Sequence, residues 1–203
     1  MDHTQVQNVK RGNLLTTKSL TMIGMMSALA FLLMFVKLPV KYIGFLELEF
    51  SDVPAVLCGL LYGPLAGVFV ELVKNLLHMM TSSTATVGEI ANFLISSCYV
   101  LGVSVVFWRS KSAKRMLLGF VVGTVLLIVG GVAINYFLTL PMYITLYFGG
   151  EESALYGMAS AMVPAIQDMK SLLLLGFVPF NLVKGILMSV ATHYVWKVFR
   201  KFV

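Results

Sequence analysis

Two polar side chains interrupt the last long apolar stretch of the chain. Asn181 and Lys184 are three positions apart, so on a helix both project from one face. A lysine at the centre of a bilayer costs about 3 kcal/mol or more, and it normally faces a cavity or a partner. An amide donates and accepts hydrogen bonds and an ammonium donates them, which suits a flat ligand with carbonyl and imine edges. The alternatives are that Lys184 extends to the membrane interface, or that the two residues form a structural polar pair.

Three further polar residues could join the same site. Asn135 is the lone amide of the apolar stretch 116–148. By itself it would more often link two helices, but it can also converge with the face of Asn181 and Lys184. Glu89 and Asn92 share one face at the start of another apolar stretch, where they can approach a pocket that opens outward.

A polar stripe marks a different helix. Glu71, Lys74, Asn75 and His78 recur at helical spacing and therefore share one face. Glu71 and Lys74 are close enough in sequence to pair. The pattern favours a charge-compensated interior of a helix bundle, near its outer surface.

These residues belong to a very apolar chain. Of its 203 residues, 59% are hydrophobic and 12% are charged, and the mean hydropathy is +0.90. Soluble domains carry about 25% charged residues, so this composition excludes a soluble enzyme, a secreted disulfide scaffold and a disordered chain. It favours a single membrane domain over residues 1–203. Cys58 and Cys98 lie in apolar runs, which favours buried packing residues over a disulfide.

The apolar stretches predict the helices that must position the polar residues. A spanning helix needs about 20 mostly apolar residues, and stretches 20–40, 86–108, 116–148 and 172–195 qualify. Stretch 53–80 is long for one helix and short for two. Gly63-Pro64 in its middle is a strong turn signal, so we expect two short helices, the first capped by Asp52. The prediction is an all-α integral membrane bundle of six transmembrane helices.

Charge placement predicts the orientation of this bundle. The net charge is +6, and the basic residues gather at both chain ends and in segment 109–115. The positive-inside rule puts these groups, and so both termini, in the cytoplasm of a multi-pass cell-membrane protein. To place segment 109–115 on the same side as the chain ends, stretch 53–80 must cross the membrane an even number of times. A re-entrant hairpin, which enters and leaves on the same side, would also satisfy this condition. Membrane topology explains the basic charge better than nucleic-acid binding does.

No catalytic or metal-binding motif is present. The chain lacks G-x-x-x-x-G-K-[ST], so it cannot hydrolyse ATP through a P-loop, and it lacks H-E-x-x-H and G-x-S-x-G. His3, His78 and His193 are widely separated and show no metal-ligand spacing. We therefore expect neither enzymatic activity nor a metal or cofactor.

Two further segments are candidates for contacts with a ligand or a partner. Segment 37–51, expected outside the membrane, is apolar around Phe45 and Leu46. It could be a lid that excludes water from a ligand, or an anchor in the membrane interface. Gly24 and Ala28 are small residues four apart on the first helix, which allows close approach of another helix. That helix could belong to this chain or to a partner protein, and the spacing does not choose.

Several stretches carry a more specific pattern. They read LEFSDVPA at 48–55, YGPLAG at 62–67, VELVKNLLH at 70–78 and GEIANF at 88–93, followed by Asn181-x-x-Lys184 in the last helix. This pattern resembles the substrate-binding S components of energy-coupling-factor (ECF) vitamin transporters, most of all the riboflavin-specific members. The resemblance runs from the first helix to the last and is most specific over residues 50–93.

The resemblance implies a ligand pocket near the outer face, beneath the first loop. In that pocket Asn135, Asn181 and Lys184 would hydrogen-bond the edge of a riboflavin isoalloxazine ring, and Phe45 and Leu46 would cover the ring. Riboflavin would be the transported ligand, not a cofactor.

The resemblance also implies partners. A transmembrane coupling protein would dock on Gly24 and Ala28, where the family usually has alanine at the first position, and two ATPase subunits would complete the transporter. The resulting hypothesis is a high-affinity riboflavin-binding subunit without catalysis of its own. The alternatives are an S component for another heterocyclic vitamin and a stand-alone secondary transporter with Lys184 as a proton-coupled charge.

Overall fold

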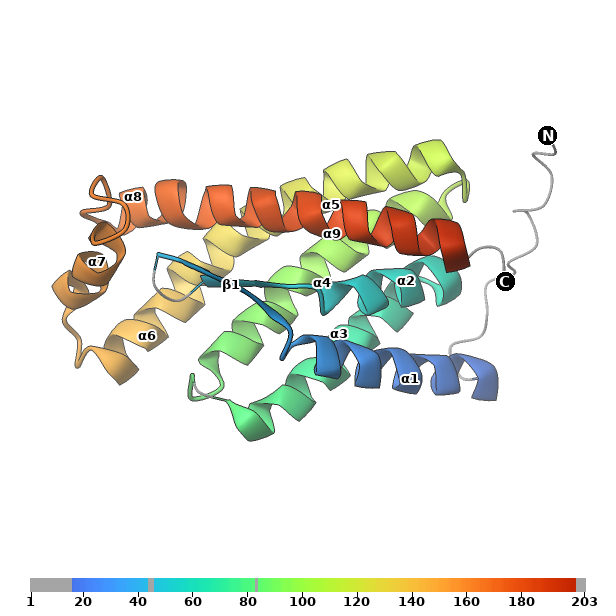
Figure 1. Ribbon diagram of the computed structural model, residues 1–203, viewed down its shortest axis with the longest axis horizontal. Coiled ribbons are helices and arrows are strands. Elements are labelled where there is room, and N and C mark those ends of the chain that lie inside the picture. The colour runs from blue at the N-terminus through green and yellow to red at the C-terminus, as the bar shows by residue number, and fades with distance from the viewer. Residues whose placement is uncertain (1–15, 44–45, 83, 200–203) are drawn as a thin grey trace.

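The computed structural model describes residues 16–43, 46–82 and 84–199, and these are mostly helical (Figure 1). In chain order the elements are α1 (Thr17–Leu33), β1 (Lys37–Tyr42), β2 (Leu46–Glu49), α2 (Asp52–Tyr62), α3 (Pro64–His78), η1 (Met79–Thr81), α4 (Val87–Trp108), α5 (Ala113–Ile134), η2 (Asn135–Thr139), α6 (Leu140–Tyr147), α7 (Glu152–Ser160), α8 (Met169–Ser171), η3 (Leu172–Phe177) and α9 (Val178–Phe199).

Three helical stretches of the described chain are long and apolar enough to cross a membrane. They are Val87–Trp108, Ala113–Tyr147 and Met169–Val198, of 22, 35 and 30 residues. The second combines α5, η2 and α6, and at 1.5 Å per residue it extends about 50 Å, which exceeds the roughly 30 Å hydrocarbon core. This stretch is therefore longer than one perpendicular crossing requires. η2 and η3 are π-helical segments within these stretches.

The helix pair α2–α3 is broken where the sequence predicts. α2 ends at Tyr62, Gly63 has a φ of +110°, and Pro64 begins α3. Only glycine adopts this backbone conformation without strain, and proline suits a first helical position. With 11 and 15 residues, both helices are shorter than the roughly 20 residues of a full span. Six complete crossings therefore stay a prediction.

Segment 37–51 adds a short hairpin that the sequence analysis did not predict to a fold that is otherwise mostly helical, as expected. α1 ends at Leu33, well before residue 40, and the chain then forms an antiparallel hairpin that pairs Lys41 with Glu47 and Tyr42 with Leu46. Glu47 lies 2.5 Å from Lys37 and 3.1 Å from Lys41, so ion pairs reinforce the hairpin. The alternation of Leu and Glu over residues 46–49 is the period-two signal of a strand, and sequence analysis missed it.

The hairpin leads into the bundle, and α2 begins in its interior (Figure 1). Ser51 and Asp52, at the start of α2, are both fully buried. The prediction that Asp52 caps this helix is wrong. Ser51 holds the capping position without a side-chain hydrogen bond, and Asp52 is the first helical residue. Its carboxylate instead pairs with Lys74 of α3 and Lys184 of α9.

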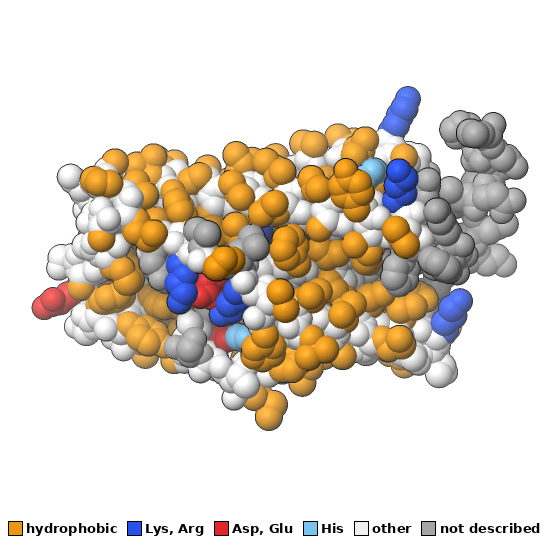
Figure 2. All heavy atoms as spheres, in the orientation of Figure 1, with side chains coloured by type: hydrophobic (Ala, Val, Ile, Leu, Met, Phe, Trp, Pro, Cys, Tyr) orange, Lys and Arg blue, Asp and Glu red, His pale blue; other side chains and the backbone are white. Residues whose placement is uncertain are grey.

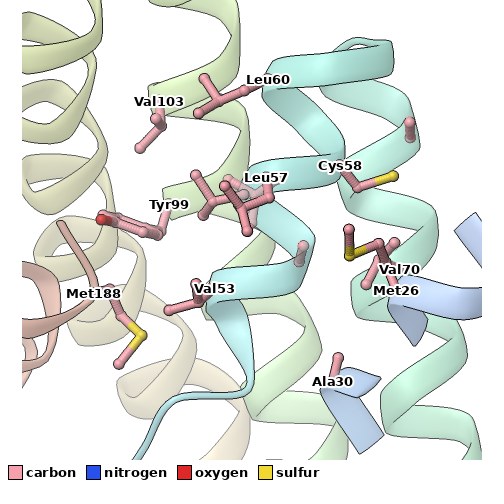
Figure 3. Packing of buried hydrophobic residues seen from close by; sticks show 14 of the residues in the cluster. Met26, Ala30, Val53, Leu57, Cys58, Leu60, Val70, Tyr99, Val103 and Met188 are labelled. Atoms are coloured by element: carbon pink, nitrogen blue, oxygen red, sulfur yellow. The ribbon is translucent and has the colours of Figure 1, made fainter. Parts of the chain in front are cut away.

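Buried apolar side chains from several helices form the core. Figure 3 shows Leu57 of α2, Tyr99 and Val103 of α4, and Met188 of α9 in one cluster. α4 and α5 approach so closely that a Cβ on Gly102 would lie 2.7 Å from the Cα of Gly123. Cys58 and Cys98 are both free thiols, as the sequence predicts.

The surface is largely apolar, and its charges are localised (Figure 2). The start of α1, the α4–α5 connection and the end of α9 lie at one end of the bundle (Figure 1), which brings the described basic residues near them together. They are Lys18, Arg109, Lys111, Lys114, Arg115 and Lys197. This shared location agrees with the expectation that the basic segments occupy one side of the membrane.

Candidate functional site

A cavity of about 570 Å³ lies between the hairpin, α4, the η2–α6 segment, α7 and α9. This volume falls in the range of small-molecule binding pockets. Six of the seven residues predicted to contact a ligand line it: Leu46, Glu89, Asn92, Asn135, Asn181 and Lys184. The seventh, Phe45, lies outside the described residues. Side chains that are far apart in the sequence thus converge on one space.

Asn181 presents an amide to this cavity. Its side chain has no hydrogen-bond partner among the described residues, although the residue is only 3% exposed. Gly131 of α5 lies directly against it, because a Cβ on Gly131 would collide with Asn181 Nδ2. The absence of a side chain at residue 131 therefore makes room for the amide. A buried amide without a partner costs free energy unless a ligand or water completes its hydrogen bonds.

Asn135 stands at the start of the π-helical segment η2. Its Nδ2 donates to the Gly131 carbonyl oxygen at 2.6 Å. This hydrogen bond fixes the orientation of the amide and leaves its Oδ1 on the side away from Gly131. π-helical turns inside α-helices occur frequently at functional sites. Here the turn accompanies one of the polar side chains of the cavity wall.

Lys184 lines the cavity and also belongs to a buried charge cluster. Its Nζ lies 2.9 Å from Asp52 Oδ2 and donates to Ser96 Oγ at 3.2 Å and Asn92 Oδ1 at 3.5 Å. The side chain does not extend to the membrane interface, so that alternative is excluded. Lys184 instead sits between a carboxylate and the cavity. Its three donors face Asp52, Ser96 and Asn92, so a ligand would bind the ammonium by taking the place of a protein acceptor, most readily Asn92 at 3.5 Å.

Asp52 is the residue of this site that sequence reasoning missed. It is fully buried, and it pairs with Lys74 of α3 as well as with Lys184 of α9. Ser96 Oγ lies 3.0 Å from Oδ2. Its place in the first turn of α2 also lets the positive end of the helix dipole stabilise the carboxylate. The sequence signal was an aspartate directly before an apolar helix. Because this is also the usual place of a helix cap, the sequence suggested a local role for Asp52 and not a contact with distant lysines.

A chain of hydrogen bonds extends this cluster to the hairpin. Glu49 Oε1, at the end of β2, accepts from Asn92 Nδ2 at 3.0 Å and from Ser51 Oγ at 2.9 Å. Lys74 Nζ donates to Ser51 Oγ at 2.8 Å. Asn92 therefore touches both Glu49 and Lys184, and the cavity floor connects the hairpin with α3, α4 and α9.

Glu89 lies at another part of the cavity wall, beside the α3–α4 connection. Its Oε1 is 2.9 Å from His78 Nδ1, and its Oε2 accepts from Ser82 at 2.8 Å and Thr84 at 3.0 Å. The predicted polar stripe of α3 is thus divided. His78 reaches Glu89 at the cavity, whereas Glu71 lies 2.8 Å from Lys74 in the bundle interior.

The hairpin is tied to the helix on the opposite wall. Tyr42 Oη donates to the Leu175 carbonyl oxygen at 2.7 Å, a group of the π-helical segment η3. Leu46 lines the cavity, and Ile43 is fully buried in the apolar cluster around α6, α7 and η3. This segment therefore packs against the cavity, which favours a cover for the cavity over an anchor in the membrane interface.

The two small residues of α1 face outward. Gly24 and Ala28 are exposed, and a Cβ on Gly24 would meet no described atom within 4 Å. Of the two alternatives that the spacing left open, packing of Gly24 against another described helix of this chain is therefore not seen.

The arrangement suits binding. The cavity offers amide groups and an ammonium inside an otherwise apolar bundle, and the carboxylates Asp52, Glu49 and Glu89 are occupied by donors of the protein. Within residues 16–43, 46–82 and 84–199, no group of three His, Cys, Asp or Glu side chains is placed to hold a metal ion. A polar, uncharged ligand could supply hydrogen-bond partners to the amide groups of the cavity wall.

Comparison with known proteins identifies relatives along nearly the whole chain. Residues 18–196 match the family model described as "ECF transporter, substrate-specific component". The riboflavin transporter RibU of Staphylococcus aureus (strain TCH60) is 35% identical over 179 residues, which cover 88% of each chain. The riboflavin transporter FmnP of Bacillus subtilis (strain 168) is 32% identical over 179 residues, covering 85% of this chain and 87% of the relative.

A solved structure supports the same assignment. It is described as "Structure and mechanism of the S component of a bacterial ECF transporter" and superimposes with a TM-score of 0.70 at 32% sequence identity. The match covers 91% of this chain and 96% of that one.

Proposed function

The chain belongs to the substrate-specific components of ECF transporters, and from this premise we propose that it is the riboflavin-binding subunit of such a transporter. In this function it captures the vitamin from outside the cell and holds it in the cavity beneath the hairpin. Two curated relatives that are named riboflavin transporters support the choice of ligand.

The observation that carries the proposal is the buried Asn181 amide, which faces the cavity without a partner among the described residues. Asn135 and Lys184 line the same cavity. The isoalloxazine ring of riboflavin is flat and carries carbonyl and imine groups on one edge. An amide and an ammonium can bind that edge, while the apolar wall covers the faces of the ring.

The energetics are compatible with tight capture. Nanomolar affinity corresponds to about 12 kcal/mol of binding free energy. A largely preformed pocket loses little free energy in ordering its side chains, so a buried ring and a few desolvated hydrogen bonds can supply this amount. A phosphate on the ligand would lose its hydration in an enclosed site, so we expect FMN to bind more weakly than riboflavin.

Transport requires partners in this proposal. A transmembrane coupling protein docks on the exposed face around Gly24 and Ala28 of α1, and two ATPase subunits supply the energy. Both termini lie in the cytoplasm and six helices cross the cell membrane. The common location of the basic residues at one end of the bundle supports this orientation.

Purification and uptake experiments test the proposal. The protein purified from cells is expected to carry flavin absorption, and isothermal titration of flavin-free protein is expected to show binding of riboflavin. Colourless protein that binds a different vitamin would overturn the choice of substrate but leave the family intact. In proteoliposomes, uptake should need the coupling protein, the ATPases and ATP. Uptake by this chain alone under a proton gradient would identify a secondary transporter instead.

A further inference from the structure

Two buried side chains on one face of α3 have acceptor oxygens without donors. Glu71 is fully buried, and neither Oε1 nor Oε2 has a hydrogen-bond partner in the part of the chain that the structure describes. Asn75 lies one turn further along and is 1% exposed. Its Nδ2 donates to the Glu71 carbonyl oxygen at 2.8 Å, which leaves its Oδ1 without a donor. This pair lies outside the cavity wall.

The charges around Glu71 do not balance when every group is ionised. Glu71 faces Lys74 on its own helix, Asp52 lies beyond Lys74 on α2, and these groups connect to Glu49 of β2 and Lys184 of α9. α1 also packs against α3, and its single charged residue is at its exposed N-terminal end. Three carboxylates thus share two ammonium groups. Glu49 lines the cavity, whereas Asp52 and Glu71 are fully buried. An unbalanced charge inside a membrane bundle is strongly unfavourable, which favours the neutral form of one of the buried carboxyl groups.

The contacts single out which one. Asp52 receives both ammonium groups, and Glu49 receives the Asn92 amide and the Ser51 hydroxyl, so donors stabilise both as carboxylates. Glu71 Oε2 lies 2.8 Å from Lys74 Nζ, but the approach does not have hydrogen-bond geometry, and the same ammonium is engaged by Asp52 and Ser51. Glu71 is therefore the least stabilised carboxylate of the cluster.

We infer that Glu71 is a buried proton-binding site that stays neutral in the folded protein. The bound proton makes Glu71 a donor, and the unpartnered Oδ1 of Asn75 is a neighbouring acceptor on the same face of α3. With Glu71 neutral, Glu49 and Asp52 balance Lys74 and Lys184. The ammonium of Lys184 then faces the cavity from a cluster without net charge. This inference does not depend on the identity of the ligand.

Infrared spectroscopy tests the inference directly. A protonated carboxyl group has a C=O stretch above the amide I region, where ionised carboxylates do not absorb. The full chain, free of flavin and held in a detergent without carbonyl groups, is expected to show such a band at neutral pH. The band should be lost in Glu71→Gln and kept in Glu151→Gln, an exposed glutamate outside the cluster whose removal leaves the charge balance around Glu71 unchanged. Glu71→Gln should also unfold close to the wild-type temperature, because the substitution replaces one neutral group by another.

The result that overturns the inference is equally specific. A wild-type spectrum without a protonated carboxyl band, or a band that persists in Glu71→Gln, excludes a neutral Glu71. If Glu71→Gln does not fold, the wild-type chain labelled with ¹³C-glutamate gives the answer. The band must then shift to lower frequency, and an unshifted band excludes every glutamate as its source.

Discussion

Asp52 and Lys184 lie 132 positions apart in the sequence, and their side chains meet at 2.9 Å across α2 and α9. The pair joins the N-terminal end of α2 to the cavity wall. Lys184 thereby has two environments at once, a buried carboxylate on one side and the cavity on the other. The position of this ammonium therefore depends on a residue that does not line the cavity.

Replacing Asp52 by asparagine is expected to destabilise the fold strongly. The substitution leaves Lys74 and Lys184 without their shared counter-charge, and removing one partner of a buried pair costs about 3–5 kcal/mol. Thermal unfolding in detergent should show a large decrease of the midpoint. Glu151→Gln is the control, because Glu151 is an exposed residue in the segment before α7. Equal midpoints for the two variants would contradict the role of Asp52.

Truncating Asn181 is expected to weaken riboflavin binding without weakening the fold. Its amide has no partner within the described chain, so Asn181→Ala removes only a contact to the ligand. One hydrogen bond contributes about 1 kcal/mol, which corresponds to a roughly fivefold rise in Kd by isothermal titration. Gln167→Ala, at an exposed amide outside the cavity, should change neither Kd nor the unfolding midpoint. An unchanged Kd for Asn181→Ala would remove this residue from the site.

Gly131 offers a second route to the same amide. A methyl group at this position would collide with Asn181 Nδ2 and push the amide out of place. Gly131→Ala should therefore raise Kd about as much as Asn181→Ala does. In the double variant the two effects should not add, because both act through one group. Additive losses of binding free energy would show that Gly131 acts by another path. Gly157→Ala is the control, since a Cβ there meets no described atom within 4 Å.

Tyr42 is expected to control how fast a bound ligand leaves. Its hydroxyl holds the hairpin to the Leu175 carbonyl oxygen, and Tyr42→Phe removes this bond while it keeps the ring. The loss of about 1 kcal/mol should raise the dissociation rate of riboflavin roughly fivefold in stopped-flow fluorescence. Tyr194→Phe, at an exposed position on α9, should have no effect. If both variants release riboflavin at the wild-type rate, the hairpin does not limit release.

Acid is expected to loosen the hairpin through Glu47. Partial burial alone would raise the pKa of Glu47, but the hydrogen bonds and charges of Lys37 and Lys41 outweigh it and lower the pKa below its ordinary value. A carboxyl whose folded pKa is lowered stabilises the fold above its unfolded pKa, which is about 4.3, and this stabilisation is lost as the pH falls through the folded pKa. The pairs are partly exposed, so we expect about 0.2–1 kcal/mol.

Amide hydrogen exchange in β1 and β2 measures this effect. At neutral pH the hairpin of Glu47→Gln should exchange faster than that of the wild type, and the difference should disappear at pH values well below 4. A difference that persists in acid would mean that the ion pairs are not its cause.

Sequence patterns predicted much of the fold because a membrane helix is indicated by a continuous apolar stretch of neighbouring residues. Long apolar stretches predicted α4, the α5–α6 stretch and α9, and Gly63-Pro64 predicted the break between α2 and α3. The polar residues of the cavity could be predicted because hydrogen-bonding groups are rare and costly in hydrocarbon.

The rest depends on contacts between distant parts of the chain. The partnership of Asp52 with Lys74 and Lys184 joins three helices, and no local spacing encodes it. The hairpin was missed for a different reason. Its apolar residues suggested a covering loop, although the alternation over 46–49 carried the strand signal.

The start of α2 is where the cover of the cavity and its polar wall are fastened to each other. Ser51, the residue before the helix, donates to Glu49 of the hairpin, and Asp52, its first residue, pairs with Lys184 at the cavity wall. A displacement of the hairpin would therefore be transmitted through this junction to the ammonium group, so that opening the entrance and loosening the grip on a guest would be one event.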